Sequence, residues 1–142
     1  MISYLEGNIL LKKDKFIIVI VSGIGYQVFL SGPALLKLPE SGSDVKLFCF
    51  QNIKEDALDL YGFMAHSELE FFETLMDIRG VGPKSALAIL DVAPMKDLKA
   101  AIKEGRPDLM TRASGIGSKT GERIILELRN NPKLNQEIAK NG

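Results

Sequence analysis

The stretch Gly80-Val81-Gly82-Pro83-Lys84-Ser85-Ala86-Leu87-Ala88-Ile89-Leu90 recurs 35 residues later as Gly115-Ile116-Gly117-Ser118-Lys119-Thr120-Gly121-Glu122-Arg123-Ile124-Ile125. In each copy, a glycine–aliphatic–glycine turn precedes a helical pattern that carries a lysine two residues past the second glycine. The glycines permit positive φ and let a ligand approach the backbone closely. The helix after the turn offers free N–H groups and the positive end of its dipole. Each copy therefore predicts an anion site.

The candidate site residues are the paired glycines and the basic side chains beside them: Gly80, Gly82, Lys84, Gly115, Gly117, Lys119 and Arg123. Other phosphate-binding motifs fail here, because a Walker loop needs glycine at Ala113 and Ser118, and the dinucleotide fingerprint needs it at Ser85 or Thr120. A single glycine turn could merely join two helices. The duplication and the repeated lysine instead favour two phosphates of a nucleic-acid backbone.

Helical patterns fill the second half of the chain. Ser67-Glu68-Leu69-Glu70 is a predicted capping box at the start of the first helix. Further helices are predicted over residues 84–92, 95–103, 108–112 and 118–129, with Gly105 as a C-terminal stop and a last turn or two from Pro132.

The first half of the chain has the pattern of short strands. Apolar β-formers cluster at residues 9–11, 16–21, 26–30, 45–50 and 58–63, and residues 33–37 suit a short helix. Five strands with this insertion fit a small closed or partly open barrel, either OB-like or SH3-like. The fold class is therefore α+β, with a β-barrel domain over 1–64 and an all-α domain over 65–142.

Composition bounds the function. Of the 142 residues 46% are apolar and 25% charged, which is typical of globular proteins. Lys plus Arg equal Asp plus Glu at 18, so nucleic-acid binding must depend on the local placement of charge. One cysteine, Cys49, and one histidine, His66, exclude an intrachain disulfide and a zinc site of the usual Cys/His kind.

We expect Cys49 in the core and His66 structural or exposed, with no cofactor. No apolar run reaches the ~20 residues of a membrane span, and Met1–Glu6 is not a signal peptide, so we expect a cytoplasmic protein.

The paired turns are similar to helix-hairpin-helix motifs, which bind DNA backbones without reading sequence, and the whole chain resembles the RuvA family. The resemblance covers nearly all of residues 1–140. It rests on both hairpins, the opening 1–7, Gly23-Ile24-Gly25-Tyr26, Glu55-Asp56-Ala57 and Leu60-Tyr61-Gly62-Phe63. It implies an OB-fold domain, a helical domain with two hairpins, and a homotetramer, or an octamer of two tetramers, that seats four-way (Holliday) junction DNA.

The resemblance also assigns roles. Gly80, Gly82 and Lys84 would form the first phosphate clamp, and the second would consist of Gly115, Gly117, Lys119 and Arg123. Glu55 and Asp56 match the family's acidic pin, although on composition alone they would be a solvated turn. The chain would be a non-catalytic subunit of an ATP-dependent branch-migration complex driven by the RuvB motor. That complex acts in homologous recombination, DNA repair and the SOS response to DNA damage.

The chain departs from the family pattern in several places. Ala113-Ser114 stands where Leu-Pro is usual, Ser118 replaces a position that is often basic, and Gly121 costs the helix about 1 kcal/mol relative to Ala. The second clamp is therefore expected to be weaker or looser. Family members usually continue into a third domain that contacts RuvB. We expect that domain to be absent here and the 142-residue chain not to recruit the motor.

Two alternatives remain open. Residues 80–86 also resemble the hairpin of base-excision DNA glycosylases, although the β-rich first half argues against that enzyme class. The barrel could instead bind single strands, but its sequence lacks an evident basic face studded with aromatic residues.

Overall fold

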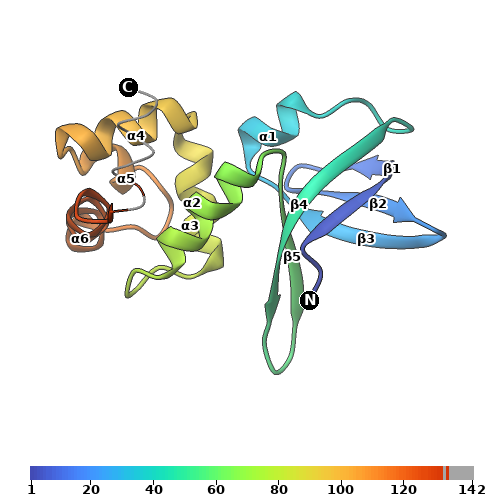
Figure 1. Ribbon diagram of the computed structural model, residues 1–142, viewed down its shortest axis with the longest axis horizontal. Helices are drawn as coiled ribbons and strands as arrows, with labels where there is room; N and C mark the ends of the chain where they lie inside the picture. The colour runs from blue at the N-terminus through green and yellow to red at the C-terminus, as the bar shows by residue number, and fades with distance from the viewer. Residues whose placement is uncertain (133, 135–142) are drawn as a thin grey trace. The chain divides into compact units, whose positions relative to one another are not determined.

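The first half of the chain forms a closed five-stranded barrel in the computed structural model, which describes residues 1–132 and 134 (Figure 1). Its elements are β1 Tyr4–Lys12, β2 Phe16–Val21, β3 Ile24–Phe29, α1 Gly32–Lys37, β4 Asp44–Ile53 and β5 Leu58–Phe63. The strands follow the order β1-β2-β3-β5-β4, and β4 pairs with β1 to close the barrel. This order, with a helix between β3 and β4, is the OB-fold arrangement. The OB-like prediction is confirmed, and the SH3-like alternative is wrong.

Strand alternation explains the barrel core. Ile17, Val19 and Val28 are completely buried because every second residue of a strand points inward. β1 serves two partners: its first half pairs with β4 and its second half with β2, with a shift in register between Ile9 and Leu11. At Gly7 a Cβ would collide with the main-chain oxygen of Ile20, so glycine is what lets β1 pass so close to β2.

The β4–β5 hairpin extends away from the rest of the barrel (Figure 1). Its tip, residues 54–57, is closed by a bond in which the Lys54 N–H donates to the Ala57 carbonyl at 2.8 Å. Glu55 and Asp56 are exposed in this tip. The hairpin therefore presents both carboxylates to solvent.

The second half of the chain is helical, as predicted. Its helices are α2 His66–Met76, α3 Pro83–Val92, α4 Met95–Glu104, α5 Asp108–Thr111 and α6 Ser118–Arg129. Their fully buried side chains include Phe72, Leu75, Ile89, Leu98, Ile102 and Ile124. Gly105 ends α4 in the left-handed conformation (φ +69°), and its N–H donates to the Ala101 and Ile102 carbonyls, so the predicted stop is confirmed.

The predicted capping box at the start of α2 is wrong. The helix begins at His66, so Ser67 lies inside its first turn instead of capping it. Oε1 of Glu70 lies 3.1 Å from Nδ1 of His66, one helical turn earlier. The exposed His66 ring also packs edge-on against Phe48, at 5.3 Å between centroids.

Two compact units make up the structure, Met1–Phe71 and Phe72–Gly142, so α2 begins in one and ends in the other. The change from strands to helices falls between β5 and α2, and a domain boundary after residue 64 stays a prediction. The helical turn expected after Pro132 lies almost wholly outside the described residues. Within the described part of the chain, no helix is long and apolar enough to cross a membrane.

Candidate nucleic-acid interface

The two glycine turns have nearly the same backbone conformation. The first glycine of each is in the left-handed region, with φ +91° at Gly80 and +85° at Gly115. The second glycine is the N-cap of the following helix, with φ −96° and ψ −177° at Gly82, and −86° and 177° at Gly117. The sequence repeat is therefore a structural repeat.

The aliphatic residue between the glycines holds each turn in place. Val81 and Ile116 are each only 6% exposed. The Val81 N–H donates to the Ile78 carbonyl at 3.0 Å, and the Ile116 N–H donates to that of Ala113 at 3.1 Å. A buried side chain and a local hydrogen bond thus hold each turn in its conformation.

Both helices after the turns start with main-chain N–H groups that have no partner among the described residues. No side chain caps Gly82 or Gly117, and in each helix the N–H of the fourth residue is the first to bond back to the N-cap carbonyl. Pro83 has no N–H, so α3 offers the N–H groups of Lys84 and Ser85. α6 offers three, from Ser118, Lys119 and Thr120. The second turn therefore has one main-chain donor more than the first.

Positive side chains lie close to these donors in the sequence. Lys84, Lys119 and Arg123 are exposed, and none of them forms an ion pair within residues 1–132. Two further arginines were missed by the sequence reasoning: Arg79 directly precedes the first turn and Arg112 lies three residues before Gly115, both of them exposed. Because they fall outside the repeated positions, only their closeness to the glycines could have indicated them. Charge is thus concentrated locally in a chain whose net charge is zero.

The turns leave room above their backbones. A Cβ placed on Gly80, Gly82 or Gly117 would have no non-adjacent protein atom within 4 Å. A Cβ on Gly115 would meet only Ser85 Oγ, at 3.9 Å, so the second turn lies beside the first turn of α3. The structure therefore brings the predicted clamp residues together as two adjacent open turns.

Gly121, a departure from the family pattern, has a packing reason. A Cβ there would lie 2.7 Å from Thr111 Cγ2 and 3.6 Å from the Pro107 carbonyl oxygen. The Thr111 hydroxyl donates to the Asp108 carbonyl at 2.8 Å, which holds the methyl group toward α6. The glycine lets α5 pack closely on α6, and whether the second clamp is weaker stays a prediction.

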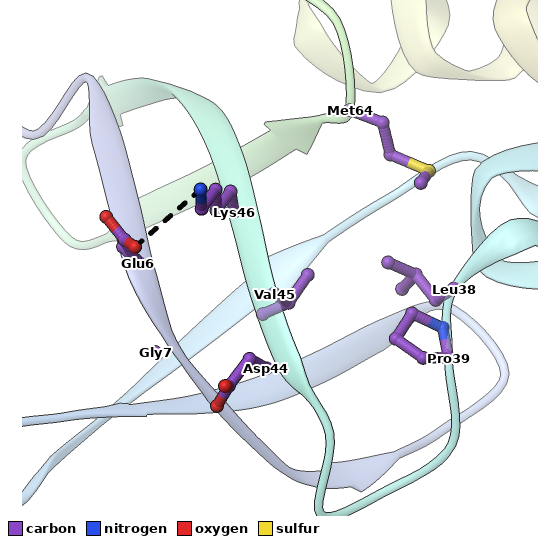
Figure 2. A pocket seen from close by; sticks show the side chains of 8 residues that line it. All are labelled: Glu6, Gly7, Leu38, Pro39, Asp44, Val45, Lys46 and Met64. Atoms are coloured by element: carbon purple, nitrogen blue, oxygen red, sulfur yellow. Dashed lines mark ion pairs between the residues drawn. The ribbon is translucent and has the colours of Figure 1, made fainter.

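A hollow on the barrel beside β1 and β4 does not suit phosphate (Figure 2). Carboxylates of Glu6 and Asp44 line it together with a single cation, Lys46, whose Nζ lies 4.0 Å from Glu6. Excess negative charge repels phosphate. Residues 1–132 and 134 contain no group of three or more His, Cys, Asp or Glu side chains placed to hold a metal ion.

Barrel and turns together define a structural class: an OB-fold unit followed in the chain by a tandem helix-hairpin-helix unit. Residues 1–62 match the family model of the RuvA N terminal domain, and residues 72–130 match that of the SAM-like helix-hairpin-helix tandem.

Relatives extend the match to the whole chain. "Holliday junction branch migration complex subunit RuvA" of Clostridium perfringens (strain 13 / Type A) is 38% identical over all 142 residues, which cover 71% of that protein. The proteins of the same name from Clostridium botulinum (strain Loch Maree / Type A3) and Clostridium beijerinckii are 39% and 40% identical. They match over 99% and 97% of this chain and 70% of their own lengths. The chain belongs to the RuvA family.

Proposed function

We propose that this protein binds four-way DNA junctions by their phosphate backbones and holds them open for branch migration. The observation that carries this is the pair of adjacent turns with the same backbone conformation, free helix N–H groups and unpaired cations. Main-chain donors and mobile cations recognise phosphate and do not distinguish bases, so binding would be independent of sequence. Relatives that match the whole chain carry the name of a Holliday junction branch migration subunit, which supports the junction as the substrate.

The phosphate contacts would come from Gly80, Gly82 and Lys84 at the first turn, and from Gly115, Gly117, Lys119 and Arg123 at the second. Glu55 and Asp56 would act as an acidic pin, since their exposed hairpin tip offers negative charge without a neutralising partner in residues 1–132. Like charge repels phosphates, so the pin would keep strands apart instead of binding them.

A non-catalytic role is part of the proposal, with ATP-driven motion supplied by another subunit. The resemblance supports RuvB as that motor, a cytoplasmic location, and a homotetramer or an octamer. Native mass spectrometry of the free protein and of its junction complex tests the assembly, with multiples of four subunits expected. A monomer in both samples would overturn that part.

A gel-shift comparison of four-way, duplex and single-stranded DNA of equal nucleotide content tests the function. We expect the tightest binding to the four-way substrate, with little change when its sequence is altered. Equal binding of junction and duplex would contradict the proposal. The glycosylase alternative, which the relatives do not favour, predicts release of a damaged base from duplex DNA, and this is measured on the same protein.

A further inference from the structure

We propose that the barrel carries a second, separate nucleic-acid site that binds unpaired DNA. In this site bases stack on Phe16 and Phe29, and Lys13 and Lys15 contact the phosphates. The site is independent of the helical turns and goes beyond the proposed grip on junction backbones. No such face is evident in the sequence, but strand pairing brings Phe16 and Phe29 together beside the turn that carries Lys13 and Lys15.

Strand register assembles the aromatic residues into a row. Phe16 lies opposite Phe29, Phe29 opposite Tyr61, and Tyr61 opposite Phe50, across β2, β3, β5 and β4. Directly opposite residues share one face of a sheet. The sequence neighbours Ile17 and Val28 are completely buried in the core, so the row lies on the outer face of the barrel. Four residues scattered from 16 to 61 thus lie side by side on one face of the sheet.

Ring contacts show how this row could receive a base. The Phe16 and Phe29 centroids are 6.0 Å apart with the planes at 68°, and Phe29 and Tyr61 are 5.8 Å apart at 36°. Tyr61 is 3% exposed, whereas Phe16 and Phe29 are only partly buried. A base that stacks on one phenylalanine would meet the other edge-on, an arrangement that aromatic groups favour. The exposed end of the row is therefore its Phe16–Phe29 end.

Cations lie at that end. The β1–β2 turn consists of Lys13, Asp14 and Lys15, and all three residues are exposed. Main-chain bonds hold this turn: the Lys13 N–H donates to the Phe16 carbonyl at 2.8 Å, and the Leu30 N–H donates to the Lys15 carbonyl at 3.2 Å. Neither lysine forms an ion pair with another described residue. Main-chain bonds thus hold two lysines, without ion-pair partners in residues 1–132, in the turn that directly precedes Phe16.

A hollow of about 610 Å³ joins these groups and is lined by Lys13, Asp14, Lys15, Phe16 and Phe29. Its size lies within the ~300–1,000 Å³ of small-ligand sites. The hollow shown in Figure 2 has an excess of carboxylates and no aromatic side chain. Cations beside aromatic stacking surfaces are the combination by which proteins bind single strands, and OB-folds bind oligonucleotides on this strand face and on the loop between the first two strands. Charge and stacking therefore both favour an unpaired strand.

The experiment separates this site from the helical turns. The background is the full chain carrying Lys84→Ala, Lys119→Ala and Arg123→Ala. The probe is fluorescein-labelled (dT)12, and its binding is measured by fluorescence anisotropy at low salt. In this background, Phe16→Leu with Phe29→Leu should weaken binding about tenfold or more, because leucine keeps apolar volume but removes the stacking surface. Phe16→Tyr with Phe29→Tyr should retain binding.

The lysines are tested in the same assay. Lys13→Ala with Lys15→Ala should lower the salt dependence of (dT)12 binding by about 1.4 in log–log slope, at about 0.7 for each phosphate contact on single strands. Lys37→Ala with Lys46→Ala is the matched control, since it removes two other exposed barrel lysines and should leave the slope unchanged.

Photo-crosslinking keeps the proposal testable if the leucine variants unfold. An oligonucleotide carrying 5-iododeoxyuridine should crosslink the unaltered protein at Phe16 or Phe29. Crosslinks confined to residues 72–130 would overturn the proposal. Folded leucine variants that bind (dT)12 as tightly as the background does would also overturn the proposal. This holds even if those variants change the mass of the assembly, because Phe16 and Phe29 would then form a contact between copies.

Discussion

At the scale of single residues, a side chain's surroundings decide its chemistry more than its type does. Cys49, expected in the core, is 3% exposed on β4, and burial raises the pKa of its thiol to about 11. Burial in the barrel thus makes the chain's one cysteine a core residue with little thiolate character. The carboxylates of Glu55 and Asp56 are in the opposite position, fully in water at a hairpin tip.

Cys49 should be inert toward alkylation in the folded protein. The thiolate is the nucleophile, and with a pKa of about 11 about one thiol in a thousand is ionised at pH 8. Iodoacetamide at pH 8 should therefore modify the native protein about 100-fold or more slowly than the protein in guanidinium chloride. The raised pKa also gives stability that is fully present below about pH 8.5 and is lost as the pH rises toward 11. Equal alkylation rates in the two solutions would contradict the buried position.

Glu55→Gln with Asp56→Asn should leave folding intact, since an exposed tip contributes little packing. Loss of the two negative charges should maintain or raise junction affinity and reduce the preference for junction over duplex, as measured by gel shift. Glu40→Gln with Asp44→Asn removes two other exposed carboxylates of the barrel and is the matched control. Much weaker junction binding by the tip variant would show that the pin attracts DNA and does not repel it.

At the scale of elements, the two helices that follow the glycine turns differ in the main-chain N–H of their first residue. α3 begins with Pro83 and α6 with Ser118, so the first main-chain donor exists only in α6. The backbone around both positions is otherwise alike, which lets each turn serve as the control for the other.

Ser118→Pro should weaken junction binding about tenfold without destabilising the fold. Proline suits the first position of a helix, and Gly117 already has the extended conformation that a residue before proline needs. The lost hydrogen bond to a charged phosphate is worth about 1.5–3 kcal/mol. Thermal unfolding should show an unchanged or higher midpoint. Pro83→Ser, the reverse exchange at the first turn, should bind at least as tightly as the parent, and unchanged binding by Ser118→Pro would exclude this N–H as a ligand.

The α5–α6 contact gives a second prediction at this scale. Gly121→Ala gains up to about 1 kcal/mol of helix propensity but forces a methyl against Thr111 Cγ2, so alone it should be neutral or destabilising. Thr111→Ser removes that methyl and keeps the hydroxyl that bonds Asp108. The double variant should therefore be more stable than the sum of the single effects, by about 0.5 kcal/mol or more in urea unfolding. Strict additivity would mean that the two residues are not in contact.

At the scale of the whole molecule, zero net charge is compatible with the proposed phosphate binding, because exposed cations without ion-pair partners in residues 1–132 lie at the turns. Lys84→Ala, or Lys119→Ala with Arg123→Ala, should weaken junction binding alike for all sequences. Each lost phosphate contact should reduce the log–log salt slope by about 0.9. Lys103→Ala on α4, an exposed lysine outside both turns, should leave the slope unchanged. An unchanged slope in the clamp variants would show that these side chains do not touch phosphate.

Local patterns made most of the architecture predictable. Turn glycines, the stop at Gly105 and the alternation of strand residues are set by neighbours in the chain, so five strands and both hairpins were anticipated. Long-range contacts were not. β1 extends back to Tyr4 because it pairs with β4 some 40 residues later, and the aromatic row exists only once four strands are in register. The space at Gly121 likewise depends on a side chain ten residues away.

The free N–H groups at α3 and α6 have a consequence for how this surface tolerates mutation. Every amino acid except proline supplies the same amide, so the proposed main-chain contacts would survive almost any exchange of side chain. An alanine scan would pass over them and assign the whole interface to Lys84, Lys119 and Arg123. Replacing single amides by esters, through chemical synthesis or suppressor tRNA, would measure how much each N–H contributes to DNA affinity. Sequences that have drifted far at these positions could still hold the same backbone in the same way.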